Sequence, residues 1–218
     1  IKEAIIPSFI TKIDQYSFDG CEKLQLVHFE ENSRLKTIEN FAFSASSLIK
    51  INLPRSLTKI GFGSFSYCNN LVDVNFPENS ELELFEQSSF SYSTLESISI
   101  PSSISKLDDQ WCLTTPKIYN INIFLNKDEQ NIVYYQNEFI LSKSNPKNDL
   151  FDVLLFARRD IVKARIPSFI TKIENYAFDE CKKLRSVVFS DDSKLTSLGK
   201  AAFAGSLIDG IFIPDHVA

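Results

Sequence analysis

The chain of 218 residues contains no methionine, six glycines and two histidines, and it has no long uninterrupted apolar run. A membrane-spanning helix needs about 20 consecutive apolar residues, so we expect no membrane span in this segment. The formal net charge of −5 argues against a nucleic-acid partner, because backbone contacts need a concentrated field of Lys and Arg. Since the chain neither begins with Met nor contains one, we expect it to be part of a longer protein.

Residue patterns of known catalytic chemistry are also missing. The sequence has no nucleophile elbow, no phosphate-binding loop and no paired metal motif, and its four cysteines form no C-x-x-C pair. Carboxylates are frequent, but they recur in equivalent polar turns, as in ENSRL at 31–35 and DDSKL at 191–195. We interpret them as solvated turn residues. The sequence therefore predicts no enzymatic activity, no cofactor and no metal site.

Internal repetition dominates what is present. Proline follows an alternating apolar stretch at intervals of 47, 47, 66 and 47 residues, at positions 7, 54, 101, 167 and 214. The neighbouring residues repeat as well, since PSFITKI occurs at 7–13 and at 167–173, and PRSLTKI at 54–60. A fixed period of this size is typical of stacked repeat architectures.

Each block of 47 residues divides into 23 and 24. A pattern of apolar residues at its first, fourth and sixth positions predicts a strand of about six residues, with the third and fifth positions facing outward. Nine copies of this pattern begin at Ile1, Leu24, Leu48, Leu71, Leu95, Ile118, Ile161, Leu184 and Ile208.

A second repeated feature is an apolar residue followed five positions later by phenylalanine. One coil departs from it, with Cys112 after Leu107 and Trp111 beside it. We interpret these residues as an aromatic core shared by stacked coils, because one coil alone cannot bury its apolar face. The six regular pairs are Ile13 and Phe18, Ile38 and Phe43, Ile60 and Phe65, Phe85 and Phe90, Ile173 and Phe178, and Leu198 and Phe203.

The units IPSFITKIENYAFDECKKLRSVVF (166–189) and LPRSLTKIGFGSFSYCNNLVDVNF (53–76) resemble the BspA-type leucine-rich repeat of bacterial and protist surface proteins. The resemblance extends over nearly the whole chain except about residues 124–160. It implies a curved, right-handed leucine-rich-repeat solenoid, an α/β-type repeat that is mostly β, with a parallel sheet on its concave side. It also implies a location at the cell surface and adhesion to host cells or matrix proteins.

The cysteines fit the repeat better than a disulfide framework. Cys21, Cys68 and Cys181 occupy the same place in their coils, and Cys112 lies in a phenylalanine slot. Cys21 and Cys68 are two coils apart, which is about 9–10 Å at one strand spacing per coil. A disulfide needs Cα atoms within about 7 Å. We therefore expect all four cysteines to be small buried core residues.

The outward positions of the concave strands are the first candidate for partner binding. Two interpretations stay open: a polar recognition strip, or the polar cover and Asn ladders that any water-facing sheet acquires. The candidate residues are Lys50, Asn52, Asp73, Asn75, Ser97, Ser99, Asn120 and Asn122.

The second candidate is the interruption of the repeat. We expect one solenoid over residues 1–218, interrupted at about 124–160 by a hairpin-like insertion packed on its flank. The insertion carries an aromatic set that could either contact a partner or fold back onto the irregular coil. This set is Tyr134, Tyr135, Phe151 and Phe156. The basic residues Arg158, Arg159, Lys163 and Arg165 are most simply a solvated edge.

The function expected from this architecture is binding of a protein. The resemblance favours a surface adhesin or antigen that contacts host or matrix proteins. The alternative is an intracellular or self-assembling repeat scaffold, because open solenoid ends can pair with another chain.

Overall fold

The computed structural model describes residues 1–217 except 105, 109, 125–130 and 148. The chain divides into two compact units, Ile1–Gln130 and Asn131–Ala218, and each is described here by itself. The described residues contain strands and turns but no helix. Both units contain coils in which a long strand and a short strand each pair in parallel with their counterparts in the next coil, which confirms the predicted, mostly β leucine-rich-repeat solenoid.

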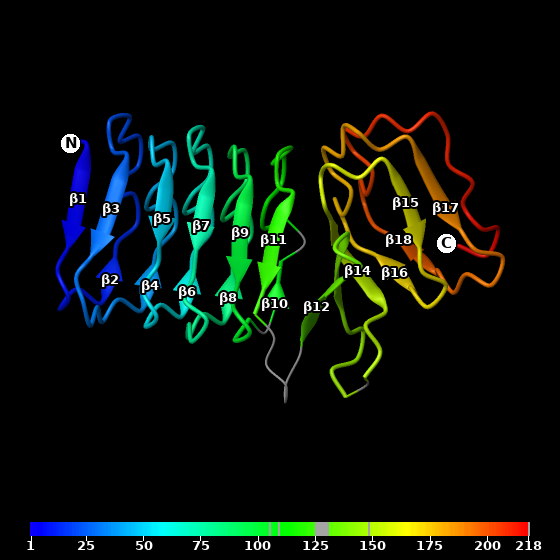
Figure 1. The fold of residues 1–218 in the computed structure, drawn as a ribbon, viewed down its shortest axis with the longest axis horizontal. Helices are drawn as coiled ribbons and strands as arrows, with labels where there is room; N and C mark the ends of the chain where they lie inside the picture. The colour runs from blue at the N-terminus through cyan, green and yellow to red at the C-terminus, as the bar shows by residue number, and fades with distance from the viewer. Residues whose placement is uncertain (105, 109, 125–130, 148, 218) are drawn as a thin grey trace. The chain divides into compact units, whose positions relative to one another are not determined.

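Unit 1 begins each coil with a longer strand, and these strands lie side by side in parallel (Figure 1). β1 pairs with β3, and β5, β7, β9 and β11 follow one another in a four-stranded sheet. These long strands are β1 (Glu3–Ile6), β3 (Leu26–Phe29), β5 (Lys50–Asn52), β7 (Asp73–Asn75), β9 (Ser97–Ile100) and β11 (Asn120–Ile123).

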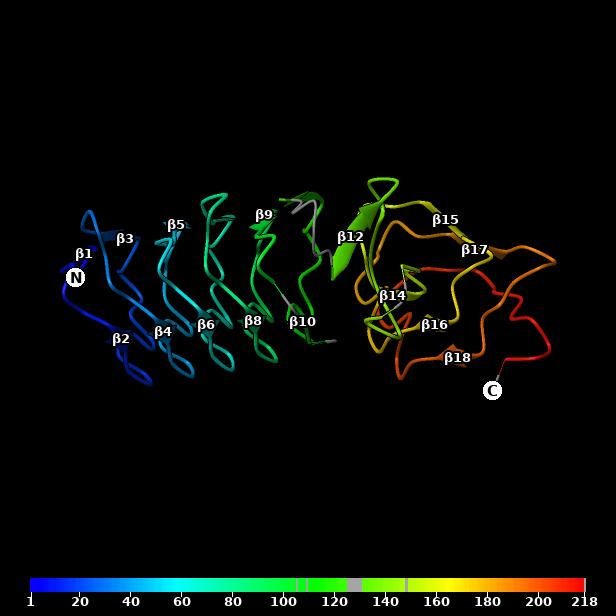
Figure 2. The same cartoon turned by 90° about the horizontal axis from the view of Figure 1, so that it is seen from below.

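A second parallel sheet of two-residue strands lies on the opposite side of the coils of unit 1 (Figure 2). Each short strand contains the repeated Lys-Ile motif or its equivalent and places its apolar residue toward the interior. The short strands are β2 (Lys12–Ile13), β4 (Thr37–Ile38), β6 (Lys59–Ile60), β8 (Leu84–Phe85) and β10 (Lys106–Leu107).

The register of the long strands confirms that the period alternates between a shorter and a longer step. Glu3 pairs with Leu26 across a shorter step, and Asp73 pairs with Ser97 across a longer one. The long strands contain three or four residues rather than the expected six. The missing residues are the first two of the pattern, since β1 begins at Glu3 and β9 at Ser97, and both strands end at the sixth position. The first position belongs to the preceding turn, because the amides of Leu24 and Leu71 donate to the carbonyls of Cys21 and Cys68.

A third ladder of backbone hydrogen bonds joins the turns between the short strand and the next long strand. In one coil the amides of Gly63, Phe65 and Tyr67 donate to the carbonyls of Gln87, Ser89 and Ser91 in the next coil. Gly63 and Tyr67 both have positive φ, and this pair of left-handed residues recurs at equivalent positions of other coils. A Cβ at Gly63 would meet the Phe41 ring at 2.6 Å, so this position requires glycine.

The predicted aromatic spine forms the core of unit 1. The rings of Phe18, Phe43, Phe65 and Phe90 stack in order, with centroids 5.0, 5.3 and 5.3 Å apart. The three inner rings, those of Phe43, Phe65 and Phe90, are fully buried, whereas Phe18 in the first coil is half-buried. Where Cys112 replaces phenylalanine, the adjacent Trp111 supplies the aromatic contact, with its ring 6.1 Å from Phe90.

Unit 2 contains two coils of the same kind. The long strands β15 (Lys163–Ile166) and β17 (Ser186–Phe189) pair in parallel, and the short strands β16 (Lys172–Ile173) and β18 (Ser197–Leu198) pair with each other. The ninth predicted strand, at 208–213, is reduced to a single bridge between Val187 and Ile211.

Before these coils, unit 2 contains an antiparallel hairpin of β12 (Ile132–Tyr135) and β13 (Phe139–Ser142). Gln136 and Asn137 both have positive φ, as in a type I′ hairpin turn. β13 pairs antiparallel with β14 (Val153–Ala157), and β14 pairs parallel with β16. The hairpin therefore extends the sheet that the short strands build. The prediction of one continuous solenoid over residues 1–218 stays a prediction.

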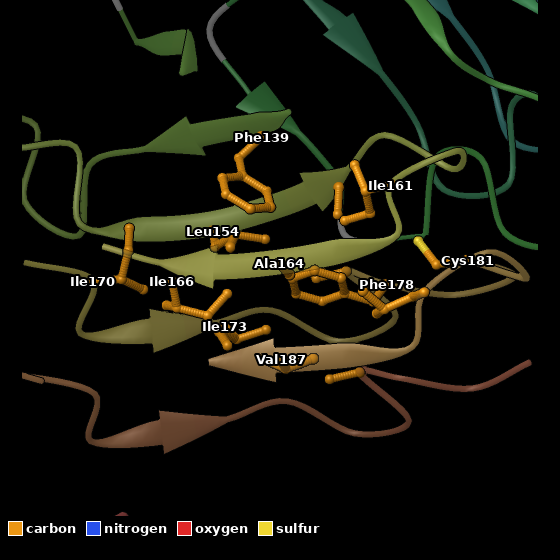
Figure 3. Close-up of a cluster of buried hydrophobic side chains, with 14 of the residues drawn as sticks. Phe139, Leu154, Ile161, Ala164, Ile166, Ile170, Ile173, Phe178, Cys181 and Val187 are labelled. Carbon is orange, nitrogen blue, oxygen red and sulfur yellow. The ribbon is translucent and has the colours of Figure 1, made fainter. Parts of the chain in front are cut away.

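The core of unit 2 joins hairpin and coils (Figure 3). Phe139 from β13 meets Phe178 edge-on at 6.0 Å, and Phe178 stacks on Phe203 at 4.8 Å. Within unit 2, Phe139 thus adds an aromatic ring from an antiparallel strand to the stack of Phe178 and Phe203. Leu154, Ile173 and Val187 are buried in the same cluster.

The coil that contains β14 has a shorter turn than its neighbour. The stretch from Leu154 to Ile161 is shorter than the equivalent stretch from Ile173 to Leu184, although Leu154 and Ile173 are partners in register. The Arg159 side chain lies where the shorter turn leaves space, and its Nη1 donates hydrogen bonds to the carbonyls of Ala157 and Ala177. Arg159 is 3% exposed and lies over the Phe156 ring, so the prediction that it belongs to a solvated edge is wrong.

Candidate functional site

The strands of unit 1 arrange the eight candidate residues of the outward face in two rows. The residues at the third position of the repeated pattern form one row, since Lys50 pairs with Asp73, Asp73 with Ser97, and Ser97 with Asn120. The fifth positions form the other row, in which Asn52 pairs with Asn75 and Ser99 with Asn122. We call these eight residues the polar strip.

Asp73 organises the polar interactions of the strip. Its carboxylate lies 2.9 Å from the Lys50 Nζ and accepts a 2.9 Å hydrogen bond from the Asn75 Nδ2. The same amide nitrogen lies 3.2 Å from the Asn52 Oδ1. One coil further along, the Asn120 Nδ2 donates to the Ser97 Oγ at 3.2 Å. The strip therefore has side chains already held in place, which lowers the entropic cost of ordering them on binding.

One member of the strip is not available to a partner. Ser99 is 8% exposed, and its Oγ accepts a hydrogen bond from the Phe76 amide at 3.0 Å. This contact holds the hydroxyl against the backbone of the neighbouring coil, so the expectation that Ser99 is available for a partner is wrong. Lys50, Asn52, Asn120 and Asn122 are at least partly exposed, and they present the donors and acceptors of the strip to solvent.

A cleft of about 670 Å³ adjoins the strip at Asn52. It lies beyond the carboxyl ends of β3 and β5 and is lined by Glu30, Asn32, Arg55 and Glu81 together with the neighbouring turn residues. The sequence explains its position: the short turn after β5 is flanked by the longer turns at 30–34 and 77–81. The Arg55 guanidinium lies 3.6 Å from the Glu81 carboxylate, and both side chains are exposed.

The aromatic residues proposed on the insertion are mostly packed into unit 2. Phe156 is 2% exposed beneath Arg159, so its proposed role in a contact surface is wrong. Tyr135 meets Phe169 edge-on at 5.6 Å, and Phe151 packs against the same core. Tyr134 is half-buried, with its hydroxyl donating to the Asn137 carbonyl. Apolar burial of these rings stabilises the hairpin, which is why they face inward.

All four cysteines are free. Cys68, Cys112 and Cys181 are buried, whereas Cys21 is partly exposed, so the expectation of a buried Cys21 is wrong. Cys21 lies in the first coil, whose turn has no preceding coil against it within unit 1. Burial raises the pKa of the Cys68 thiol to about 11 and keeps it in its unreactive, protonated form. Over the described part of the chain, no group of three or more His, Cys, Asp or Glu residues could hold a metal ion.

The turns of unit 1 also carry exposed aromatic side chains that the sequence reasoning missed. Tyr67 and Tyr92 stack at 4.8 Å, and both are exposed. They occupy the same place after the apolar residue of their short strands, Ile60 and Phe85, and each has positive φ. The sequence does contain a signal for this pair, because a tyrosine follows the apolar residue of the short strand at the same distance in two consecutive coils. The stack covers one face of each ring and leaves both side chains exposed to contacts.

Comparison with known proteins agrees with this fold. Residues 1–118 and 152–218 match the BspA type leucine rich repeat region in six copies. No curated protein matches the chain. Among the described residues, no helix is long and apolar enough to cross a membrane.

Three solved bacterial structures share the fold. The pneumococcal vaccine antigen PcpA is 23% identical, with 99% of this chain and 51% of that chain covered and a TM-score of 0.86. A leucine rich cell surface protein from Faecalibacterium prausnitzii is 23% identical, with 93% and 58% covered and a TM-score of 0.68. A leucine-rich repeat protein from Eubacterium ventriosum is 19% identical, with 98% and 60% covered and a TM-score of 0.65.

The chain spans about half to three-fifths of the length of these structures. At such identities the likeness establishes the fold alone. The family match, in contrast, includes most of the sequence and agrees with the observed strand register. The chain belongs to the BspA-type leucine-rich repeat family.

Proposed function

We propose that this chain is a non-enzymatic, protein-binding repeat scaffold at the cell surface, which contacts host or matrix proteins through the polar strip and the adjoining cleft. The observation that carries the proposal is the Asp73-centred network, which holds hydrogen-bonding side chains of consecutive coils in place on one exposed sheet. A parallel sheet of stacked coils offers a wide surface whose outward residues do not build the core.

The cleft supports the same proposal, because it gives the otherwise flat strip a recess at Asn52. Interfaces gain most of their affinity from a few side chains that fill pockets, while the surrounding contacts exclude water. Arg55 gives the cleft a cation, whereas the Glu81 carboxylate is already paired with Lys36 at 2.9 Å and lies 3.6 Å from Arg55. Two similar structures are described as a vaccine antigen and a cell surface protein, which favours a surface location for this chain as well.

The binding claim is tested by changing the strip without touching the core. We expect the triple variant N52E/N75E/N122E to lose at least about tenfold in affinity for matrix proteins or host cells, because added carboxylates disrupt the amide pairing and repel an incoming acceptor. The matched control is Q15E/N69E/N70E, which adds the same charge at exposed turn positions of unit 1.

The measurement is solid-phase binding of the purified chain to a panel of extracellular matrix proteins and to intact host cells. Loss of binding by N52E/N75E/N122E, with binding by Q15E/N69E/N70E unchanged, supports the proposal. Equal binding by the wild type and both variants would remove the strip as the contact surface. Antibody staining of intact cells tests the location separately, and staining only after permeabilisation would favour the intracellular scaffold instead.

A further inference from the structure

Three exposed cations of unit 2 lie on β15 and immediately before β17. Lys163 and Arg165 are the outward residues of β15, and Arg185 immediately precedes β17. The two strands lie side by side in parallel, with Lys163 paired to Ser186 (Figure 1). Alternate residues of a strand are about 6.6 Å apart, so Lys163 and Arg165 start from neighbouring sites. The Arg185 amide donates to the Val162 carbonyl at 2.8 Å, which places Arg185 beside the start of β15. We call them the basic triad.

No carboxylate neutralises this triad within the described residues of unit 2. The ion pairs there join Arg158 to Asp160, Lys172 to Glu174 and Lys182 to Glu180. The Arg185 Nη1 donates to the backbone carbonyls of Lys182 and Leu184, which leaves the charge uncompensated.

The same face of unit 1 is organised differently. There the cation of Lys50 is paired with Asp73, and His28 lies 3.0 Å from Glu3. The numbers of charged residues in the two units differ in the same direction. Residues 1–130 contain 11 Lys and Arg against 17 Asp and Glu, whereas residues 131–218 contain 12 against 11. The uncompensated cations are thus a local property of the strand face in unit 2.

Exposed apolar side chains accompany the triad. Val162 precedes Lys163, and Val188 is paired with Arg165 in the register of the two strands. Val162 is 58% exposed and Val188 39% exposed. Neighbouring like charges repel one another, and an anionic partner would relieve this repulsion. The guanidinium groups match carboxylates with two parallel hydrogen bonds.

We propose that the basic triad and its two valines form a second interaction surface, which binds an acidic segment of a protein that also carries apolar side chains. The cations select carboxylates, and the valines give the partner's apolar side chains a surface to cover. A sulfated polysaccharide would satisfy the charges but would leave the valines without apolar contacts. The triad belongs to unit 2 and the polar strip to unit 1, and no residue is shared between them.

The test uses the whole chain and a short fluorescein-labelled peptide rich in Glu and Leu, followed by fluorescence anisotropy. We expect the variant K163E/R165E/R185E to bind this peptide at least about tenfold more weakly than the wild type. The control K147E/K194E/K200E makes the same change of charge at three exposed positions of unit 2 away from β15 and β17, and we expect it to bind within about twofold of the wild type. Binding should weaken as salt is raised.

Three results would overturn the proposal. One is equal weakening in both variants, since the effect would then come from net charge alone. Another is equal binding of the peptide that has Gln in place of every Glu. The third is binding of heparin through the triad with no binding of the acidic peptide, which would assign the surface to a sulfated glycan. If the triple reversal unfolds, as judged by circular dichroism, K163Q/R165Q/R185Q replaces it with the same expectation of weakened binding.

Discussion

At the scale of single residues, the cysteines show how a repeat position sets chemical reactivity. Cys68 and Cys181 fill the same buried place in their coils, and the Cys68 Sγ lies 3.2 Å from the Phe43 carbonyl oxygen and 3.4 Å from the Ser46 hydroxyl. Cys21 fills this place in the first coil and is partly exposed. The thiolate is the reactive form, so both burial and a raised pKa protect a cysteine from modification.

We expect one thiol of the native protein to react well before the others. With a thiol reagent at pH 8, Cys21 should be modified first, and Cys68, Cys112 and Cys181 only as the protein unfolds. Mass spectrometry of digested samples taken over time in native buffer and in urea identifies the order. Early modification of Cys68 in native buffer would show that its burial has been assigned wrongly.

Phe65 carries a second prediction at the residue scale. Its side chain is fully buried between two stacked rings, at 5.3 Å from each neighbour. We expect Phe65→Ala to lower the free energy of unfolding by about 3–5 kcal/mol, because it removes buried apolar surface and leaves a cavity. Urea melts give the value. Phe18→Ala, at the half-buried end of the same spine, should cost clearly less, and equal costs would contradict a continuous buried spine.

At the scale of elements, Asp152 connects the hairpin of unit 2 to the first regular coil. Its carboxylate accepts hydrogen bonds from the Ser144 amide at 2.9 Å, the Ser144 hydroxyl at 2.8 Å and the Thr171 hydroxyl at 2.8 Å. Burial alone would raise the pKa of Asp152, but these hydrogen bonds outweigh it and lower the pKa below its usual 3.8. The ionised side chain therefore stabilises the folded state.

We expect Asp152→Ala to lower the free energy of unfolding by about 2–4 kcal/mol at neutral pH. Because the folded-state pKa is depressed, this stabilisation is present above pH 3.8 and is lost as the pH falls through the folded-state value. Urea melts of the wild type and the variant at several pH values measure the difference. Asp149→Ala, at an exposed loop position, is the control. A difference that stays constant down to low pH would contradict the role of the carboxylate.

The regular coils were predictable because burial recurs at fixed spacing. Each coil repeats the apolar positions that its neighbours must cover, so the strands, the spine and the alternating register all follow from the period. The coil of β14 was not predictable in this way, because its shortened turn is completed by the buried Arg159, and an arginine in sequence indicates exposure. The burial of Ser99 was not predictable for a similar reason, since its hydroxyl contacts the Phe76 amide, which only the stacking of the coils brings close.

The candidate site was predictable in its geometry but not in its contacts. Alternation along a strand placed Lys50, Asn52 and Asp73 on one face, and the register then aligned them in rows. The network around Asp73 depends on side-chain conformations, and the cleft depends on the unequal lengths of three turns. The cations of the basic triad became a group only when the pairing of β15 and β17 brought Arg185, a whole coil further along the chain, beside the start of β15.

At the scale of the whole molecule, we propose that the outward faces of the long strands bind the partner and that the short strands have a purely structural role. Lys50 on β5 and Lys59 on β6 allow the two faces of unit 1 to be compared directly. Both are lysines in a partly exposed ion pair, Lys50 with Asp73 at 2.9 Å and Lys59 with Glu86 at 2.8 Å, and they lie on opposite sheets.

The most direct test of the central claim is lysine acetylation of the chain, free and bound to a matrix protein that it captures in the solid-phase assay, read by mass spectrometry. We expect binding to slow the acetylation of Lys50 about fivefold or more, because the partner covers the polar strip, and to leave the acetylation rate of Lys59 unchanged. Protection of Lys59 with Lys50 still freely acetylated would contradict it and would place the partner on the opposite sheet.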